Sequence, residues 1–76
     1  MMHNNIIDGK QTGKNFKEVR EKNDMTIHQM SVVMKGVPIN LIDKVENGYF
    51  IPTLEYVFDF CEYFLISIDD VIVSKL

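Results

Sequence analysis

One short segment combines a helical apolar pattern with polar side chains that can hydrogen-bond to the edges of nucleic-acid bases. Ile42 and Val45 are spaced to face inward together on a helix. The side chains left facing outward are Ile39, Asn40, Asp43 and Lys44. Asn suits the paired donor and acceptor of adenine, Lys suits guanine, and a carboxylate can accept from cytosine N4. The segment therefore predicts base-reading chemistry, although the charge of Asp43 opposes nearby phosphates.

Phosphate contacts would have to come from residues around this segment, because affinity for nucleic acid depends largely on neutralising phosphates. Lys35, in a predicted turn, and Lys44 are the first candidates, with Lys10 or Lys14 added if the N-terminal arm reaches the duplex. The backbone N–H groups behind Thr26 open a second predicted helix and could hold one phosphate. The complete predicted DNA-binding set is Thr26, Gln29, Lys35, Ile39, Asn40, Asp43, Lys44 and Asn47. Within it, Ile39 suits a thymine methyl group.

Other residues that could do chemistry do not form a site. His3 and His28 have no sequence-level acid or nucleophile partner. Glu55 and Asp59 are spaced i,i+4 and could bind a metal ion in principle, but no His accompanies them. Cys61, the single cysteine, lies in an apolar run and is interpreted as a small buried side chain. The sequence predicts a protein that is not an enzyme and that holds no metal or cofactor.

Capping signals divide the chain into five short helices, which predicts an all-α fold. The first helix is expected to begin at Asn15, with Glu18 three residues on, and to end near residues 23–24. The second opens on the pair Thr26 and Gln29. The third begins around Pro38 and stops at Asn47 and Gly48. Thr53 opens the fourth, which runs to about Phe64, and Ser67 with Asp70 opens the fifth. Residues 1–14 are expected to be a flexible arm, and residues 15–76 the domain.

The fourth helix carries three stripes. An apolar stripe is expected to face the core, and an acidic stripe is expected to face solvent. A third stripe of Tyr56, Phe60 and Tyr63 has no second core to enter, so part of it is expected to pack under the fifth helix and the rest to form a dimer interface or a partner surface. The apolar stripe is Leu54, Val57, Phe58, Cys61 and Phe64, and the acidic stripe is Glu55, Asp59 and Glu62.

Composition bounds the kind of protein. Seventy-six residues allow one small domain, and 46% hydrophobic residues are enough for a dense core. The apolar runs are too short to span a membrane, and the chain does not open with the pattern of a secretory signal, so the sequence predicts a cytoplasmic protein. The net charge is −3, divided into +2 over residues 1–38 and −5 over residues 39–76. A basic first half of the sequence and an acidic second half are compatible with a small DNA-binding protein.

From Phe16 to Ile72 the chain resembles the phage-repressor, Cro-like (XRE-type) helix-turn-helix family. The family opens its first helix with an apolar-charged-charged-apolar pattern and continues with Leu-Ser-x-x-x-Leu-Ala. It ends its third helix with Ile-x-x-Ile-Glu-x-Gly, followed by Pro-Ser-Leu-Glu and Val-Ser-Leu-Asp-Glu-Leu. The matching segments, in order and at nearly the family's spacing, are residues 16–22, 25–31, 42–48, 52–55 and 66–71. The resemblance implies a lambda-repressor-like DNA-binding domain whose second and third helices form the helix-turn-helix.

Four positions depart from the family pattern. The turn is one residue longer, with Lys35 as the predicted insertion, and Pro38 replaces the usual Ser cap. Ile27 stands where many members have a phosphate-contacting Gln. Leu65 replaces the usual Gly after the fourth helix, so a left-handed turn there would cost about 1 kcal/mol.

Two functions follow from these observations as expectations. The first is a sequence-specific, repressor-like transcription regulator that binds double-stranded DNA as a homodimer. The second is a helix-turn-helix fold used for protein contact, with weak or no DNA binding. The acidic balance and the apolar residues near the reading face favour the second; these are Ile39, Leu41, Tyr49, Phe50 and Ile51.

Overall fold

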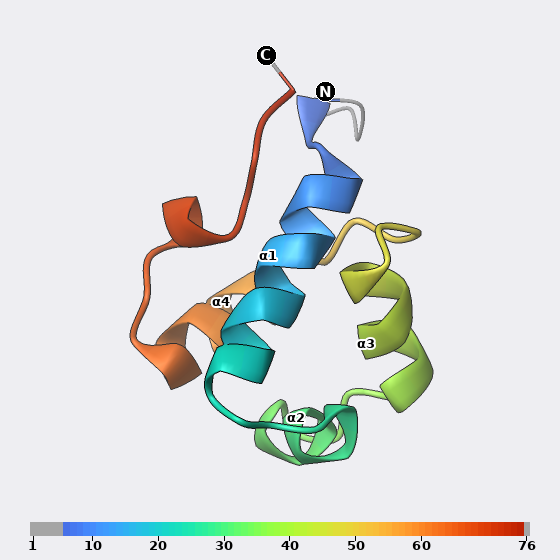
Figure 1. Cartoon of the computed structure of the whole chain (residues 1–76), viewed down its shortest axis with the longest axis vertical. Coiled ribbons are helices and arrows are strands. Elements are labelled where there is room, and N and C mark those ends of the chain that lie inside the picture. The colour runs from blue at the N-terminus through green and yellow to red at the C-terminus, as the bar shows by residue number, and fades with distance from the viewer. Residues whose placement is uncertain (1–5, 76) are drawn as a thin grey trace.

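The computed structural model describes residues 6–75, which form four α-helices and one 3₁₀ turn (Figure 1). The elements are α1 (Gly9–Lys22), α2 (Ile27–Val33), α3 (Ile39–Glu46), α4 (Leu54–Phe64) and the turn η2 (Ile68–Asp70). Helix α1 runs through the middle of the molecule, with α3 and α4 on either side and α2 below (Figure 1). The all-α prediction is confirmed, but five helices is wrong for the described residues.

Helix α1 begins seven residues earlier than the sequence predicted. Asp8, not Asn15, is the N-cap, and its side chain Oδ1 accepts from the Gln11 N–H at 3.0 Å. Asn15 lies inside the helix, where its Nδ2 donates to the Val71 carbonyl at 3.2 Å. The prediction of a flexible arm is therefore wrong from Gly9 onward. Residues 1–5 of the predicted arm, including His3, lie outside the described residues.

The two ends of the described chain are joined to each other. The Asp8 N–H donates to the Val73 carbonyl at 2.8 Å, and the Lys75 N–H donates to the Ile6 carbonyl at 2.9 Å. These bonds form an isolated antiparallel bridge between Ile7 and Ser74. Figure 1 shows both ends meeting beside the first turn of α1. The start of α1 is thus held by residues more than sixty positions away, which no local signal reveals.

The fifth predicted helix is a single 3₁₀ turn, η2. The predicted pair does close this turn, because the Ser67 N–H donates to Asp70 Oδ2 at 2.9 Å. The helix does not continue because Val71 is drawn into the core, with none of its surface exposed. From Val73 the chain is extended, and the Val73 N–H donates to Thr12 Oγ1 at 3.0 Å. The bonds to the first turn of α1 replace those of a fifth helix.

The core is assembled around Phe16 of α1. Its ring meets Phe60 edge-on at 4.6 Å between centroids and Tyr56 at 5.5 Å. Four more side chains are buried with it: Met30 of α2, Met34 directly after α2, and Ile42 and Val45 of α3, the last two as their spacing predicted. Edge-to-face pairs of this kind add about 0.5–1.5 kcal/mol beyond the area they bury. One aromatic cluster therefore joins α1 to α4, and the helix-turn-helix packs against it.

The buried side of helix α4 agrees only in part with the predicted apolar stripe: Val57 and Cys61 are buried as predicted, but Leu54 and Phe58 are exposed. Tyr56 and Phe60 are 5% and 0% exposed, whereas Leu54 and Phe58 are 69% and 52% exposed. The buried set is Tyr56, Val57, Phe60 and Cys61. The rings of Tyr56 and Phe60 both pack edge-on against Phe16, which places these two side chains in the core. The predicted dimer interface is therefore wrong for Tyr56 and Phe60, and Tyr63 alone of the three is half exposed.

Leu65 ends α4 in a left-handed conformation, with φ 56° and ψ 46°, as its place after the helix predicted. Its side chain is 89% exposed, so it contributes little packing in return for the strain. We expect Leu65→Gly to raise the free energy of unfolding by about 1 kcal/mol, because glycine adopts this conformation without a Cβ clash. Urea unfolding measures the change. Leu65→Ala, which keeps the Cβ, is the control and should give no gain.

Candidate nucleic-acid interface

Helix α2 opens with a complete capping box. Thr26 Oγ1 accepts from the Gln29 N–H at 3.1 Å, and the Thr26 N–H donates to Gln29 Oε1 at 2.8 Å. Both side chains are exposed. The cap occupies the Gln29 N–H, so this predicted phosphate donor is already used. The side-chain oxygen Oε1 of Gln29 is also used, because it accepts from the Thr26 N–H. The Nε2 group of Gln29 is the part that can donate outward.

The turn between α2 and α3 is built on two left-handed residues. Lys35 has φ 62° and Gly36 has φ 83°. The Gly36 N–H donates to the Ser31 carbonyl at 2.8 Å, and Ser31 Oγ donates to the Val37 carbonyl at 2.6 Å. These bonds satisfy the end of α2 and hold the start of α3. Lys35, the predicted insertion, therefore lies within this turn.

The Lys35 side chain reaches outward from this turn. It is 78% exposed, and its Nζ lies 3.9 Å from Asp59 Oδ1 of α4. An ion pair this long and this exposed contributes little to stability. Lys35 can therefore exchange Asp59 for another anion at small cost.

Helix α3 displays the predicted polar face. Asn40, Asp43, Lys44 and Asn47 are exposed, and Ile39 is half-buried. Pro38 is the N-cap and supplies no side-chain bond, as its replacement of the usual Ser predicted. The structure therefore brings the predicted α3 residues together on one surface, with Ile42 and Val45 buried behind it.

Two of these residues have partners that spacing alone did not indicate. Asn47 Nδ2 donates to the Asp43 carbonyl at 2.8 Å and to Asp43 Oδ1 at 3.1 Å. The amide thus partly satisfies the carboxylate that would otherwise face phosphates. Lys44 Nζ lies 5.3 Å from the centre of the Phe50 ring, in a cation–π contact. Phe50 therefore positions the ammonium group of Lys44 at the end of the reading face.

A buried ion pair holds α3 against α1. Arg20 Nε donates to Glu46 Oε2 at 2.8 Å, and Nη2 donates to Oε1 at 3.0 Å. Arg20 Nη1 donates to the Met25 carbonyl at 2.7 Å, which fixes the loop before α2. The side chains of the pair are 9% and 4% exposed. The hydrogen bond with Glu46 raises the pKa of Arg20, so the guanidinium stays charged.

The same pair influences a neighbouring side chain. Burial, and then the charge of Glu46, raise the pKa of Tyr56, whose ring packs on Phe16. The phenol therefore remains neutral beside the carboxylate. Sequence reasoning placed Arg20 and Glu46 only within family motifs and missed their pairing. The available signal was position, since Arg20 lies four residues after Phe16 and Glu46 lies four after Ile42, each on a buried face.

Within residues 6–75 no group of three or more side chains is arranged to hold a metal ion. Glu55 and Asp59 are not part of any group of three or more metal-ligating side chains in that range. Cys61 is buried and its Sγ lies 3.7 Å from the Ser67 carbonyl, and burial raises its pKa. Among the described helices, none is long and apolar enough to cross a bilayer.

Comparison with known proteins agrees with this geometry. Among solved structures, the restriction-modification controller protein C.AhdI from Aeromonas hydrophila is similar, with a TM-score of 0.72 at 15% identity over 80% of this chain and 91% of that one. The DNA-binding domain of BldD gives a TM-score of 0.75 at 13% identity over 87% and 94%. The S. venezulae BldD DNA-binding domain gives 0.75 at 13% identity over 87% and 97%.

At these identities the solved structures establish the fold alone. No curated protein sequence matches the chain. The family model described as helix-turn-helix matches residues 16–71, which is most of the chain and includes every element from the second turn of α1 to η2. The chain therefore belongs to the helix-turn-helix family of the Cro-like, XRE type.

Proposed function

We propose that this protein is a sequence-specific DNA-binding transcription regulator that acts as a homodimer. The observation that carries the proposal is the exposed polar face of α3, held in place by the buried Arg20–Glu46 pair. Family membership supports it, and so do the similar structures, two of which are DNA-binding domains.

In the proposed complex α3 lies in the major groove. Asn40, on the first turn, reads adenine, and Lys44, one turn later, donates to guanine. Ile39 packs on a thymine methyl group at the edge of this surface. Lys35 and the Nε2 group of Gln29 contact phosphates on either side of the turn. Asn47 holds Asp43 away from the phosphates, which reduces the repulsion expected from the sequence.

A single copy offers few phosphate contacts, and two copies double them. The exposed apolar residues Leu54 and Phe58, one turn apart on α4, are the surface we propose for pairing. They replace Tyr56 and Phe60, which are in the core. A two-fold dimer would read half-sites about one turn of DNA apart.

Binding of the purified protein to random-sequence duplex DNA, measured over a salt series, tests the proposal. We expect binding at low salt that weakens as salt rises, with a slope that counts the phosphates neutralised. The same titration on a selected site should saturate at two protein chains per duplex. Absence of binding at low salt would contradict the proposal and favour the protein-contact function, for which the exposed α4 residues and the acidic segment around them are the natural surface.

The Asn40 and Lys35 side chains should have different effects on binding. We expect Asn40→Ala to reduce discrimination between a selected site and random DNA by about 1–3 kcal/mol, because a base contact is lost. We expect Lys35→Ala to weaken both kinds of DNA alike, because a phosphate contact carries no sequence information. Affinities for the two duplexes measure this. If the two substitutions behave alike on specific and random DNA, Asn40 does not read bases.

A further inference from the structure

We infer that three lysines of α1 form a second DNA contact, which binds the phosphate backbone bordering the groove that α3 enters. The residues are Lys10, Lys14 and Lys17, called here the lysine row. The inference rests on the proposed function and adds to it a surface outside the helix-turn-helix. These lysines share one helix because residues 9–14 are helical.

The lysine row lies along one side of α1. Its members are spaced i, i+4 and i+7, so they share a helix face, and all three are exposed. At about 1.5 Å of rise per residue the row extends about 10 Å along the helix axis.

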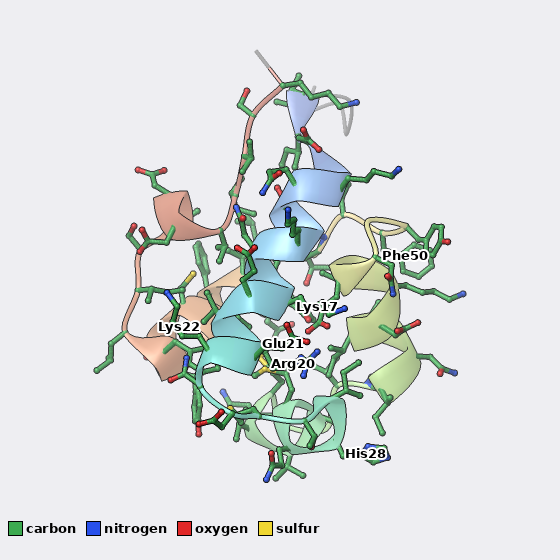
Figure 2. The ribbon with its side chains drawn as sticks, in the orientation of Figure 1. Lys17, Arg20, Glu21, Lys22, His28 and Phe50 are labelled. Atoms are coloured by element: carbon green, nitrogen blue, oxygen red, sulfur yellow. The ribbon has the colours of Figure 1, made fainter. Side chains whose placement is uncertain are left out.

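Two glycines place this face beside the end of α3. A Cβ at Gly48 would lie 2.9 Å from Lys10 Cα, and a Cβ at Gly13 would lie 2.8 Å from the Glu46 carbonyl oxygen. The first half of α1 is therefore in backbone contact with the last turn of α3. Figure 2 shows Lys17 on the side of α1 that faces α3, and Lys22 on the opposite side.

A hollow connects the lysine row to the reading face. Lys10 and Phe50 both line it, and Lys44 lies over the Phe50 ring. Lys75 also lines the hollow. Asp8 contributes one opposing charge, but its carboxylate accepts from the Gln11 N–H. Positively charged side chains are therefore found on the reading face, at the hollow and along the lysine row.

The charges elsewhere define where DNA can lie. Glu21 follows Lys17 by one turn of α1, so the basic row ends at Lys17. From Thr53 to Asp70 the chain carries five acidic residues and neither Lys nor Arg. A polyanion is therefore repelled from the α4 side and attracted to the side formed by α1 and α3.

The salt dependence of duplex binding tests the inference with a matched pair of variants. Lys17→Gln and Lys22→Gln each remove one exposed positive charge from α1, and Figure 2 shows these two side chains on different sides of the helix. We expect Lys17→Gln to lower the slope of log K against log salt by about 0.9, the value for one phosphate. Its affinity should fall by the same factor on specific and random duplexes. Lys22→Gln should leave the slope unchanged.

The possible results separate the two proposals. Equal slopes for Lys17→Gln and Lys22→Gln, whether reduced or unchanged, would overturn the inference and leave the proposed function standing. Failure of the unmodified protein to bind duplex DNA at low salt would overturn the proposed function, and the inference with it. Urea unfolding of both variants controls for loss of fold, which is not expected at exposed positions.

Discussion

Arg20→Met should lower the free energy of unfolding by about 3–5 kcal/mol, the usual cost of removing one partner of a buried ion pair. The substitution leaves the Glu46 carboxylate, which is 4% exposed on its side chain, without the guanidinium that neutralises it. It also removes the donor to the Met25 carbonyl, so the loop before α2 loses one of the hydrogen bonds that hold it to α1. For a domain of this size the loss is a large fraction of the total stability. Urea denaturation followed by circular dichroism measures it.

The double substitution Arg20→Met with Glu46→Leu is the control. Because both charges are then absent, its stability should lie closer to that of the unmodified protein than Arg20→Met does. A double-mutant cycle gives the coupling free energy between the two side chains. Additive effects of the two single changes would show that the pair does not act as a unit.

Gly13→Ala should be the second most damaging change, lowering the free energy of unfolding by about 3 kcal/mol. The new Cβ would overlap the Val45 carbonyl oxygen and lie 2.8 Å from that of Glu46. Both are backbone atoms of α3, so α1 and α3 would have to move apart. The gain in helix propensity, at most about 1 kcal/mol, does not offset this overlap.

Gly9→Ala is the matched control for this prediction, because it places the same methyl group on the same helix. Its Cβ would lie 3.2 Å from Ile51 Cδ1, the end of a flexible side chain, and 3.3 Å from the Gly48 carbonyl oxygen. We expect a change within about 1 kcal/mol, measured by urea unfolding. Equal losses for the two substitutions would show that α1 and α3 are not in close backbone contact at Gly13.

The parts of the fold that the sequence predicted well depend on short-range bonds. The capping box at Thr26, the cap at Thr53 and the stop at Gly48 each involve partners within a few residues. The left-handed conformation of Leu65 followed from its place after α4. The start of α1 was missed because its cap at Asp8 precedes a glycine, and because bonds to Val73 stabilise it from the far end of the chain.

The face of α4 could not be assigned from periodicity, since apolar residues cover most of the circumference of this helix. Which side is buried depends on the position of Phe16, and hence on how α1 and α4 cross. In the candidate site, too, local features were predicted and contacts between elements were not. Spacing predicted the outward face of α3, whereas the contacts of Lys44 with Phe50 and of Arg20 with Glu46 join residues from different elements. Such contacts follow from packing and have no local pattern.

The acid-rich segment from Thr53 to Asp70 has a consequence for the rate of complex formation. With the lysine row and Lys44 on the other side, the molecule has a large electric dipole moment even though its net charge of −3 is unfavourable. Close to a duplex, within a screening length of about 10 Å, the field of the phosphates turns the α1 and α3 side inward before contact. Encounters in the wrong orientation dissociate quickly, so a protein that DNA repels on average can still associate in a productive orientation.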